Sequence, residues 1–227
     1  MLKKIRGIVI IENHYKDSSK VLNIICELGI VGVISKGCKS LKSPLRVISN
    51  KLNYAEYVIY YNDGKLSTLK EGSIIDSFDN IKNDLTKISY ATYISDLVNQ
   101  VIKQNNDPEV FNLYLSALKK IDEGMNPTVI MNILEIKLLD YLGVGINLNG
   151  CVKCGSMNEI ITVDPDAGGY ICKKCYTNEL LFDEKVRKML RMYYLVEIDS
   201  IKDMKINDYV IDSINKFLSI YYDRYTG

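Results

Sequence analysis

The chain has 227 residues, of which 47% are hydrophobic, and its formal net charge at pH 7 is only +1. This length exceeds one typical domain, and the hydrophobic content predicts a folded protein throughout. A nearly neutral chain excludes attraction to nucleic acid by overall charge, so a role in binding nucleic acid would require local segregation of charge.

The N-terminal segment is basic up to Arg6, but it does not have the pattern of an export signal. The apolar run at residues 7–11 is too short for a secretory core and ends at Glu12. No stretch approaches the eighteen or more apolar residues of a membrane span. We therefore expect a cytoplasmic protein with reduced thiols.

The first 78 residues have the pattern of β structure. Strand candidates occupy residues 3–11, 20–28, 30–35, 54–61 and 65–75, and Asn62-Asp63-Gly64 between the last two is typical of a tight hairpin. Glycines at 7, 29, 32 and 37 allow the bends that a small closed sheet needs. Five such strands predict an oligonucleotide/oligosaccharide-binding (OB) barrel over residues 1–78, in which a strand face and loops bind single strands.

A basic stretch links the third and fourth predicted strands. No acidic residue lies between Glu27 and Glu56, whereas the interval contains Lys36, Lys39, Lys42, Arg46 and Lys51. At the rim of the barrel these cations are candidates for binding DNA phosphates, and a solvated surface loop is the alternative interpretation. Alternation along the next strand would place some of its tyrosines outside for base stacking, although we expect most to be in the core: Tyr54, Tyr57, Tyr60 and Tyr61.

Residues 79–227 have helical periodicity and form the second predicted domain. One apolar stripe consists of Ile81, Leu85, Ile88, Ala91, Val98 and Ile102. Asp107-Pro108 and Asn126-Pro127 each combine an N-cap residue with proline at the first helical position. The helix after Pro127 is apolar on most sides and stops at the glycines 143 and 145, so we expect it at the centre of a helical bundle. Two amphipathic helices are expected at residues 183–197 and 206–225.

Four cysteines form two Cys-x-x-Cys pairs separated by seventeen residues: Cys151, Cys154, Cys172 and Cys175. A spacer of about this length lets a hairpin bring both pairs around one tetrahedral Zn²⁺. Four thiolates leave no open position for a substrate, so we predict a structural zinc site in an insertion at residues 150–178. An iron–sulfur cluster would also accept four cysteines. We interpret Cys26 as a core residue and Cys38 as an incidental loop thiol.

The sequence contains no recognisable catalytic constellation. The only histidine, His14, falls in a polar segment that we place in a solvated turn between the first two strands. Asp164 and Asp166 lie in Asp-Pro-Asp-Ala-Gly-Gly, which is a turn signature. There is no phosphate-binding loop and no nucleophile elbow, so we predict that the protein is not an enzyme.

A small N-terminal barrel, a helical body and a four-cysteine hairpin inserted before the closing helices resemble the RecO family of bacterial recombination mediators over nearly the whole chain. The segment Lys36-Gly37-Cys38-Lys39-Ser40-Leu41-Lys42-Ser43 resembles the family's lysine-glycine loop, and Gly168-Gly169 precedes the second cysteine pair. The family often has arginine where this chain has Cys38 and Lys39, so we expect a weaker bidentate grip on phosphate.

The resemblance implies a protein of DNA repair and homologous recombination that binds single- and double-stranded DNA and anneals complementary strands without catalytic turnover. It also implies a RecR-type partner, with which the protein helps load recombinase onto DNA coated by single-strand-binding protein (SSB), and association with the nucleoid. Some family members lack the metal site, which implies that zinc serves stability. Two alternatives remain open: a zinc-stabilised RNA-binding or transcription-associated protein, and an adaptor that does not contact DNA.

Overall fold

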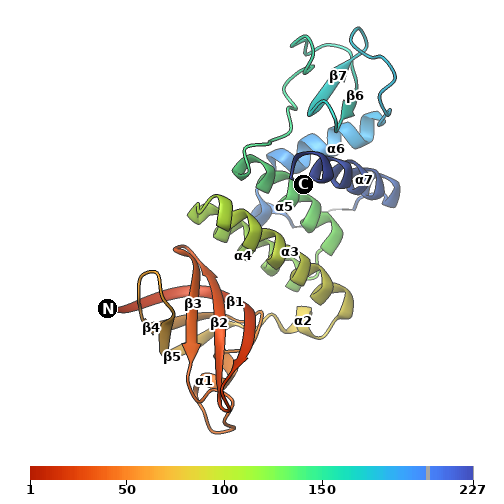
Figure 1. Ribbon diagram of the computed structural model, residues 1–227. Helices are drawn as coiled ribbons and strands as arrows, with labels where there is room; N and C mark the ends of the chain where they lie inside the picture. Colours follow the sequence, from red (N-terminus) through yellow and green to blue (C-terminus); the bar gives the residue numbers. More distant parts are fainter. Residues whose placement is uncertain (203–204, 227) are drawn as a thin grey trace. The chain divides into compact units, whose positions relative to one another are not determined.

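The computed structural model describes residues 1–202 and 205–226, and the chain forms two compact units, Met1–Gly124 and Met125–Gly227 (Figure 1). The first unit begins with five strands: β1 (Leu2–Tyr15), β2 (Ser19–Cys26), β3 (Gly29–Ser35), β4 (Tyr54–Tyr60) and β5 (Ser67–Asp76). They close into a barrel in the order β1-β2-β3-β5-β4, which confirms the predicted OB-like barrel in an α+β protein.

Strand β1 is long enough to pair with two neighbours. Its first part, from Leu2 to Ile8, pairs with β4, and its second part, from Gly7 to Tyr15, pairs with β2. A Cβ atom on Gly7 would lie 2.5 Å from the Ile25 carbonyl oxygen, so only glycine fits where β1 passes from one neighbour to the other. His14 lies within β1 opposite Lys20 and is exposed, so the predicted turn position was wrong because β1 continues past it.

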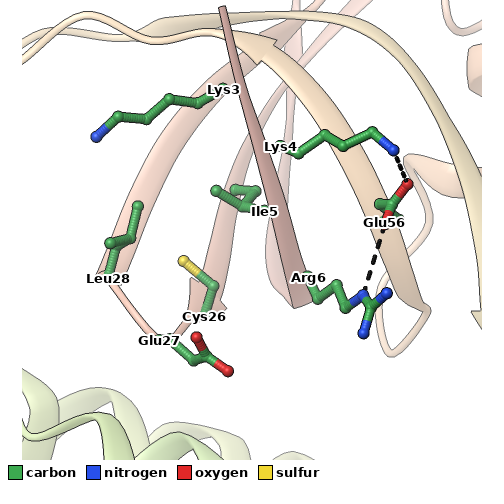
Figure 2. Close-up of a pocket in the computed structure, with 8 residues that line it drawn as sticks. All are labelled: Lys3, Lys4, Ile5, Arg6, Cys26, Glu27, Leu28 and Glu56. Atoms are coloured by element: carbon green, nitrogen blue, oxygen red, sulfur yellow. Dashed lines mark ion pairs between the residues drawn. The ribbon is translucent and has the colours of Figure 1, made fainter.

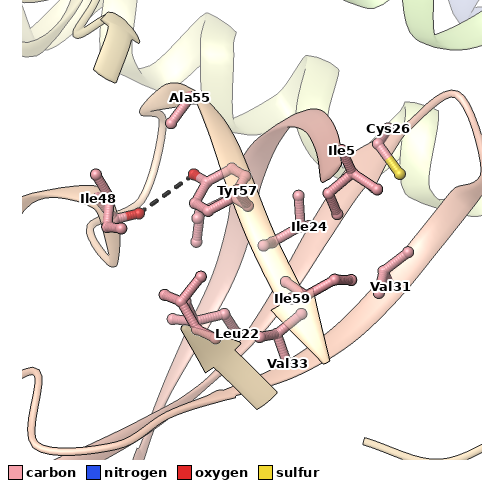
Figure 3. Close-up of a cluster of buried hydrophobic side chains, with 12 residues drawn as sticks. Ile5, Leu22, Ile24, Cys26, Val31, Val33, Ile48, Ala55, Tyr57 and Ile59 are labelled. Carbon is pink, nitrogen blue, oxygen red and sulfur yellow. Dashed lines mark hydrogen bonds between the residues drawn. The ribbon is translucent and has the colours of Figure 1, made fainter. Parts of the chain in front are cut away.

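The interior of the barrel is filled by alternating inward side chains from all five strands (Figure 3). A short helix, α1 (Leu45–Ile48), contributes Ile48 to this core, and the Tyr57 hydroxyl donates to the Ile48 carbonyl oxygen at 3.2 Å. Cys26 is only 2% exposed, which confirms its assignment to the core, and burial raises the pKa of its thiol to about 11.

The first unit continues with α2 (Asp79–Lys82), α3 (Leu85–Gln104) and α4 (Pro108–Asp122), and both α3 and α4 contact barrel strands. The predicted apolar stripe was wrong at Leu85, which is 83% exposed. The helical run is interrupted before this residue, and the Asp84 side chain caps a new helix by accepting from Thr86 N and Lys87 N. The restart changes the helical phase. The domain boundary after residue 78 stays a prediction.

The second unit is built on three α-helices, α5 (Pro127–Tyr141), α6 (Glu184–Leu195) and α7 (Asp208–Tyr225), with a 3₁₀ turn, η1 (Ile198–Ser200), after α6. Helix α5 is buried on most of its faces and contacts α6, α7 and η1, as its uniformly apolar sequence predicted. A hairpin of β6 (Ile160–Asp164) and β7 (Gly169–Cys172) lies between α5 and α6 in sequence. Among the described residues, no helix combines the length and apolar character that a membrane crossing requires.

Candidate nucleic-acid interface and metal centre

The predicted DNA-binding residues lie in the connection from β3 to β4, here called the basic loop (residues 36–51). Its first half packs on the turn between β1 and β2, where Lys39 N donates to the Ser18 carbonyl oxygen at 3.0 Å and Gly37 N donates to Ser19 Oγ at 3.3 Å. Gly37 has a φ of +67°, a backbone conformation that favours glycine. The lysine-glycine segment therefore forms a defined loop at one end of the barrel.

The five cations of the basic loop are available to an anionic ligand. Lys36, Lys42 and Arg46 are exposed, while Lys39 and Lys51 are half-buried. The Lys39 ammonium donates to the Lys16 carbonyl oxygen at 3.3 Å. None of the five forms an ion pair with a carboxylate within the part of the chain that the structure describes. Phosphate oxygens could therefore bind here without displacing an internal carboxylate.

Charge is segregated along the chain far more than the net value suggests. Residues 1–78 contain twelve Lys and Arg against seven Asp and Glu, whereas residues 79–227 contain 17 against 21. Sequence reasoning missed Lys16, which the β1–β2 turn places beside the basic loop. The hairpin that joins the first two strands could have indicated this position, because Lys16 lies in its turn.

The four cysteines of the hairpin converge on one point. Their sulfur atoms all lie within 4.8 Å of one another, and Cys154 Sγ and Cys172 Sγ are 3.6 Å apart. Four sulfurs at Zn–S distances of about 2.3 Å in a tetrahedron would be about 3.8 Å apart, which matches this spacing. Each pair sits in a tight turn, in which Gly155 N donates to the Cys151 carbonyl oxygen at 2.7 Å and Cys175 N to that of Cys172 at 3.0 Å. The donor set therefore fits a closed, structural metal site.

Comparison with known families covers both units. The family model described as recombination protein O C terminal matches residues 82–227, and the model described as recombination protein O N terminal matches residues 1–78. The chain belongs to the RecO family. The resemblance inferred from the basic loop and the cysteine hairpin is thus confirmed.

Three relatives, each named DNA repair protein RecO, align with the RecO-family chain over its full length. The proteins from Listeria monocytogenes (strain HCC23) and Bacillus subtilis (strain 168) are both 28% identical to it, and that from Halalkalibacterium halodurans is 29% identical. Each alignment covers 100% of this chain and 90–91% of the relative. The similarity therefore includes both the barrel and the helical unit.

Two thiols of the cysteine hairpin have pKa values shifted in opposite directions, lowered at Cys151 and raised at Cys175. Burial raises the pKa of Cys151, but backbone N–H groups of Cys172, Lys153 and Cys154 outweigh burial and lower it to about 6. Hydrogen bonding with Cys154, together with burial, raises the pKa of Cys175 to about 12. One thiolate therefore forms readily, whereas four thiolates side by side require a bound cation to balance their charge.

The hairpin around the cysteines is braced by polar contacts. Asp164 accepts from Ala167 N at 3.1 Å through its side chain and from Gly168 N at 3.1 Å through its carbonyl oxygen, so it is a turn residue as predicted. Lys153 forms an ion pair with Glu179. A hydrogen bond from Lys153, and then one from Thr177 N, lower the pKa of the Glu179 carboxyl to about 2. These contacts hold the two cysteine turns in place.

The tyrosines of β4 separate into two groups. Tyr54 and Tyr57 are buried, whereas Tyr60 is 51% exposed and Tyr61 is half-buried. Cys38 lies in the basic loop as predicted, and its thiol is only 1% exposed. The residue after it, Lys39, is hydrogen-bonded through its backbone to the β1–β2 turn.

Proposed function

We propose that this RecO-family protein is a DNA repair and recombination mediator that binds single- and double-stranded DNA through the basic loop, using Lys36, Lys39, Lys42, Arg46 and Lys51. The observation that supports this most is that the family's lysine-glycine loop gathers five cations that have no carboxylate partner among the described residues. Lysine attracts phosphate by its charge, and such contacts carry no information about the base sequence. The protein would therefore hold any backbone and leave the base edges free.

Free base edges are what annealing requires, because two complementary strands must meet while each is still held. Release of condensed counterions supplies the binding free energy, and no bond is made or broken. We infer that the protein anneals strands without catalytic turnover. The chain has one histidine, His14, which is exposed on β1, so paired-histidine chemistry has no basis here.

The metal site supports this activity by stabilising the second unit. Cys151, Cys154, Cys172 and Cys175 would hold a structural Zn²⁺, which cross-links the hairpin and leaves no coordination position for a substrate. The residues that bind DNA are in residues 1–78 and the ligands are in residues 151–175. We therefore expect metal loss to lower the stability of the second unit while the basic loop keeps its affinity for DNA.

An annealing assay tests the proposal directly. Complementary oligonucleotides are coated with SSB and mixed with the protein, with and without a RecR-type partner, and duplex formation is followed by fluorescence energy transfer. We expect annealing with the protein and loading of recombinase with the partner also present, in a cytoplasmic, nucleoid-associated pathway. A protein that fails to bind oligonucleotides even at low ionic strength would refute the DNA-binding function and would favour an adaptor role.

A further inference from the structure

The exposed tyrosine at the end of β4 belongs to a second group of residues suited to nucleic acid. Here we call this group the β4-end patch, defined as Tyr60, Tyr61, Lys3, Lys65 and Lys70. The Lys3 ammonium lies 4.1 Å from the centre of the Tyr61 ring, and the Lys70 ammonium lies 6.0 Å from the centre of the Tyr60 ring. Two aromatic rings are thus interleaved with lysines on neighbouring strands.

The lysines of this patch are free to bind phosphate, although other cations nearby are not. Glu56 pairs with Lys4 at 2.7 Å and with Arg6 at 3.5 Å, which neutralises much of their charge. Figure 2 shows Lys3 extending away from this ion-pair cluster. Within the described residues, Lys3, Lys65 and Lys70 form no ion pair with a carboxylate.

The patch adjoins the start of the basic loop, because Tyr60 pairs with Thr68 on β5, and Thr68 pairs with Ile34, two residues before Lys36. The patch is formed where β1 and β5 begin and β4 ends, whereas the basic loop joins the end of β3 to the beginning of β4. Strand β4, Tyr54–Tyr60, separates the patch from the end of the basic loop. A seven-residue strand at about 3.3 Å per residue spans roughly 20 Å. A single strand bound at the start of the basic loop could therefore continue onto Tyr60, whereas the end of the loop is the length of β4 away.

The surroundings of the patch suit unpaired bases. A groove of about 400 Å³ adjoins it, lined by Tyr61, Lys65 and Leu66 on one side and by Ile30 and Gly32 of β3 on the other. Tyr60 is 51% exposed, so part of its ring is open to a ligand. Bases of single strands stack on such rings, whereas bases inside a duplex already stack on each other.

We infer that the β4-end patch is a second nucleic-acid contact that binds single strands by stacking a base on Tyr60, while Lys3, Lys65 and Lys70 hold the adjacent phosphates. This inference rests on the proposed function and adds a division of labour to it. The basic loop binds backbones of either form, and the patch selects unpaired bases. The three lysines make binding at the patch depend on salt, whereas stacking on Tyr60 adds a contribution that salt does not screen.

A single tryptophan reports on the site, because the chain contains no tryptophan of its own. Tyr60→Trp keeps a stacking ring and places the only indole of the protein in the patch. We expect saturable quenching of its fluorescence by an oligo(dT) single strand and little quenching by a duplex of equal length. Tyr209→Trp on α7 is the matched control, since Tyr209 is 56% exposed and lies outside the barrel, and its fluorescence should remain unquenched.

Affinity measurements complete the test. Tyr60→Leu is expected to weaken single-strand binding roughly 5- to 150-fold, which corresponds to the loss of one stacked base at about 1–3 kcal/mol, with duplex binding changed less than about twofold. Tyr60→Phe should restore single-strand binding. Melting temperatures check that the variants fold.

Two negative results have different meanings. If the unmodified protein binds DNA, but the indole of the Tyr60→Trp variant is unquenched and Tyr60→Leu binds single strands normally, the inference is overturned while the proposed function stands. If the unmodified protein binds no DNA, the proposed function itself fails, and the inference fails with it.

Discussion

Removing the exposed charges of the basic loop gives the most direct quantitative test of DNA binding. Lys36, Lys42 and Arg46 are exposed, whereas Lys39 and Lys51 are half-buried, so the three exposed side chains should dominate. Each phosphate contact contributes about 0.7 to the log–log salt slope for single strands and about 0.9 for duplex DNA. The triple glutamine variant should therefore lose up to about 2 units of slope on single strands and about 2.7 on duplex.

The assay is fluorescence anisotropy with a labelled oligonucleotide, titrated at several salt concentrations between about 50 and 200 mM. If the slope falls by about 2 units, a fourfold increase in salt should reduce the affinity of the variant roughly 16-fold less than it reduces that of the unmodified protein. Lys103, Lys119 and Lys185 provide a control triple variant, because they are exposed on helices outside the loop. Equal slopes for the loop variant and the unmodified protein would refute the assignment of the loop, whatever the affinity.

Three further predictions concern stability. Cys151→Ser or Cys172→Ser should lower the metal content measured by elemental analysis and lower the melting temperature, since metal binding and local folding are coupled, and full metal content would contradict the site. Asp84→Ala should destabilise the protein by about 1 kcal/mol in denaturant unfolding, because α3 loses its N-cap, and an unchanged midpoint would show that the cap contributes nothing. Asn132 is fully buried in α5, and its side-chain amide has no hydrogen-bond partner among the described residues. Asn132→Leu should therefore stabilise the protein by about 1 kcal/mol in denaturant unfolding. Destabilisation would indicate that Asn132 makes an essential polar contact.

The strands and helices were predictable where a residue's role is fixed by its immediate neighbours in sequence. The proline-started helices α4 and α5 and the paired cysteines act locally. The tight hairpin predicted from the Asp-Gly step was wrong, because the connection between β4 and β5 runs from residue 61 to residue 66. Leu85 and His14 were misplaced because element boundaries depend on where backbone pairing or capping stops. The burial of Cys38 depends on packing between the basic loop and the β1–β2 turn, about twenty residues upstream, and no local pattern encodes it.

The role of the tyrosines illustrates the same limit within one strand. Alternation along β4 predicts that neighbouring side chains face opposite sides, but it does not say which tyrosine meets solvent at the end of the strand. Tyr57 is held inside by its hydrogen bond to the Ile48 carbonyl oxygen, and this contact exists because α1 packs against the barrel core. Tyr60 lies where β4 ends, with the Lys70 ammonium near its ring. The sequence could thus name the tyrosines that are candidates for stacking, but it could not show which of them is exposed.

Segregation of charge explains how a nearly neutral protein could direct DNA to one part of its chain. Residues 1–78 have five more basic than acidic residues, and residues 79–227 have four more acidic than basic ones. A polyanion is attracted to the first segment and repelled by the second, so the near-zero total reflects cancellation and not weak fields. Added salt screens both the attraction to residues 1–78 and the repulsion from residues 79–227. An isolated fragment of residues 1–78, if it folds alone, should therefore bind single-stranded DNA at least as tightly as the full chain at low salt, and much weaker binding would show that the helical residues supply essential contacts.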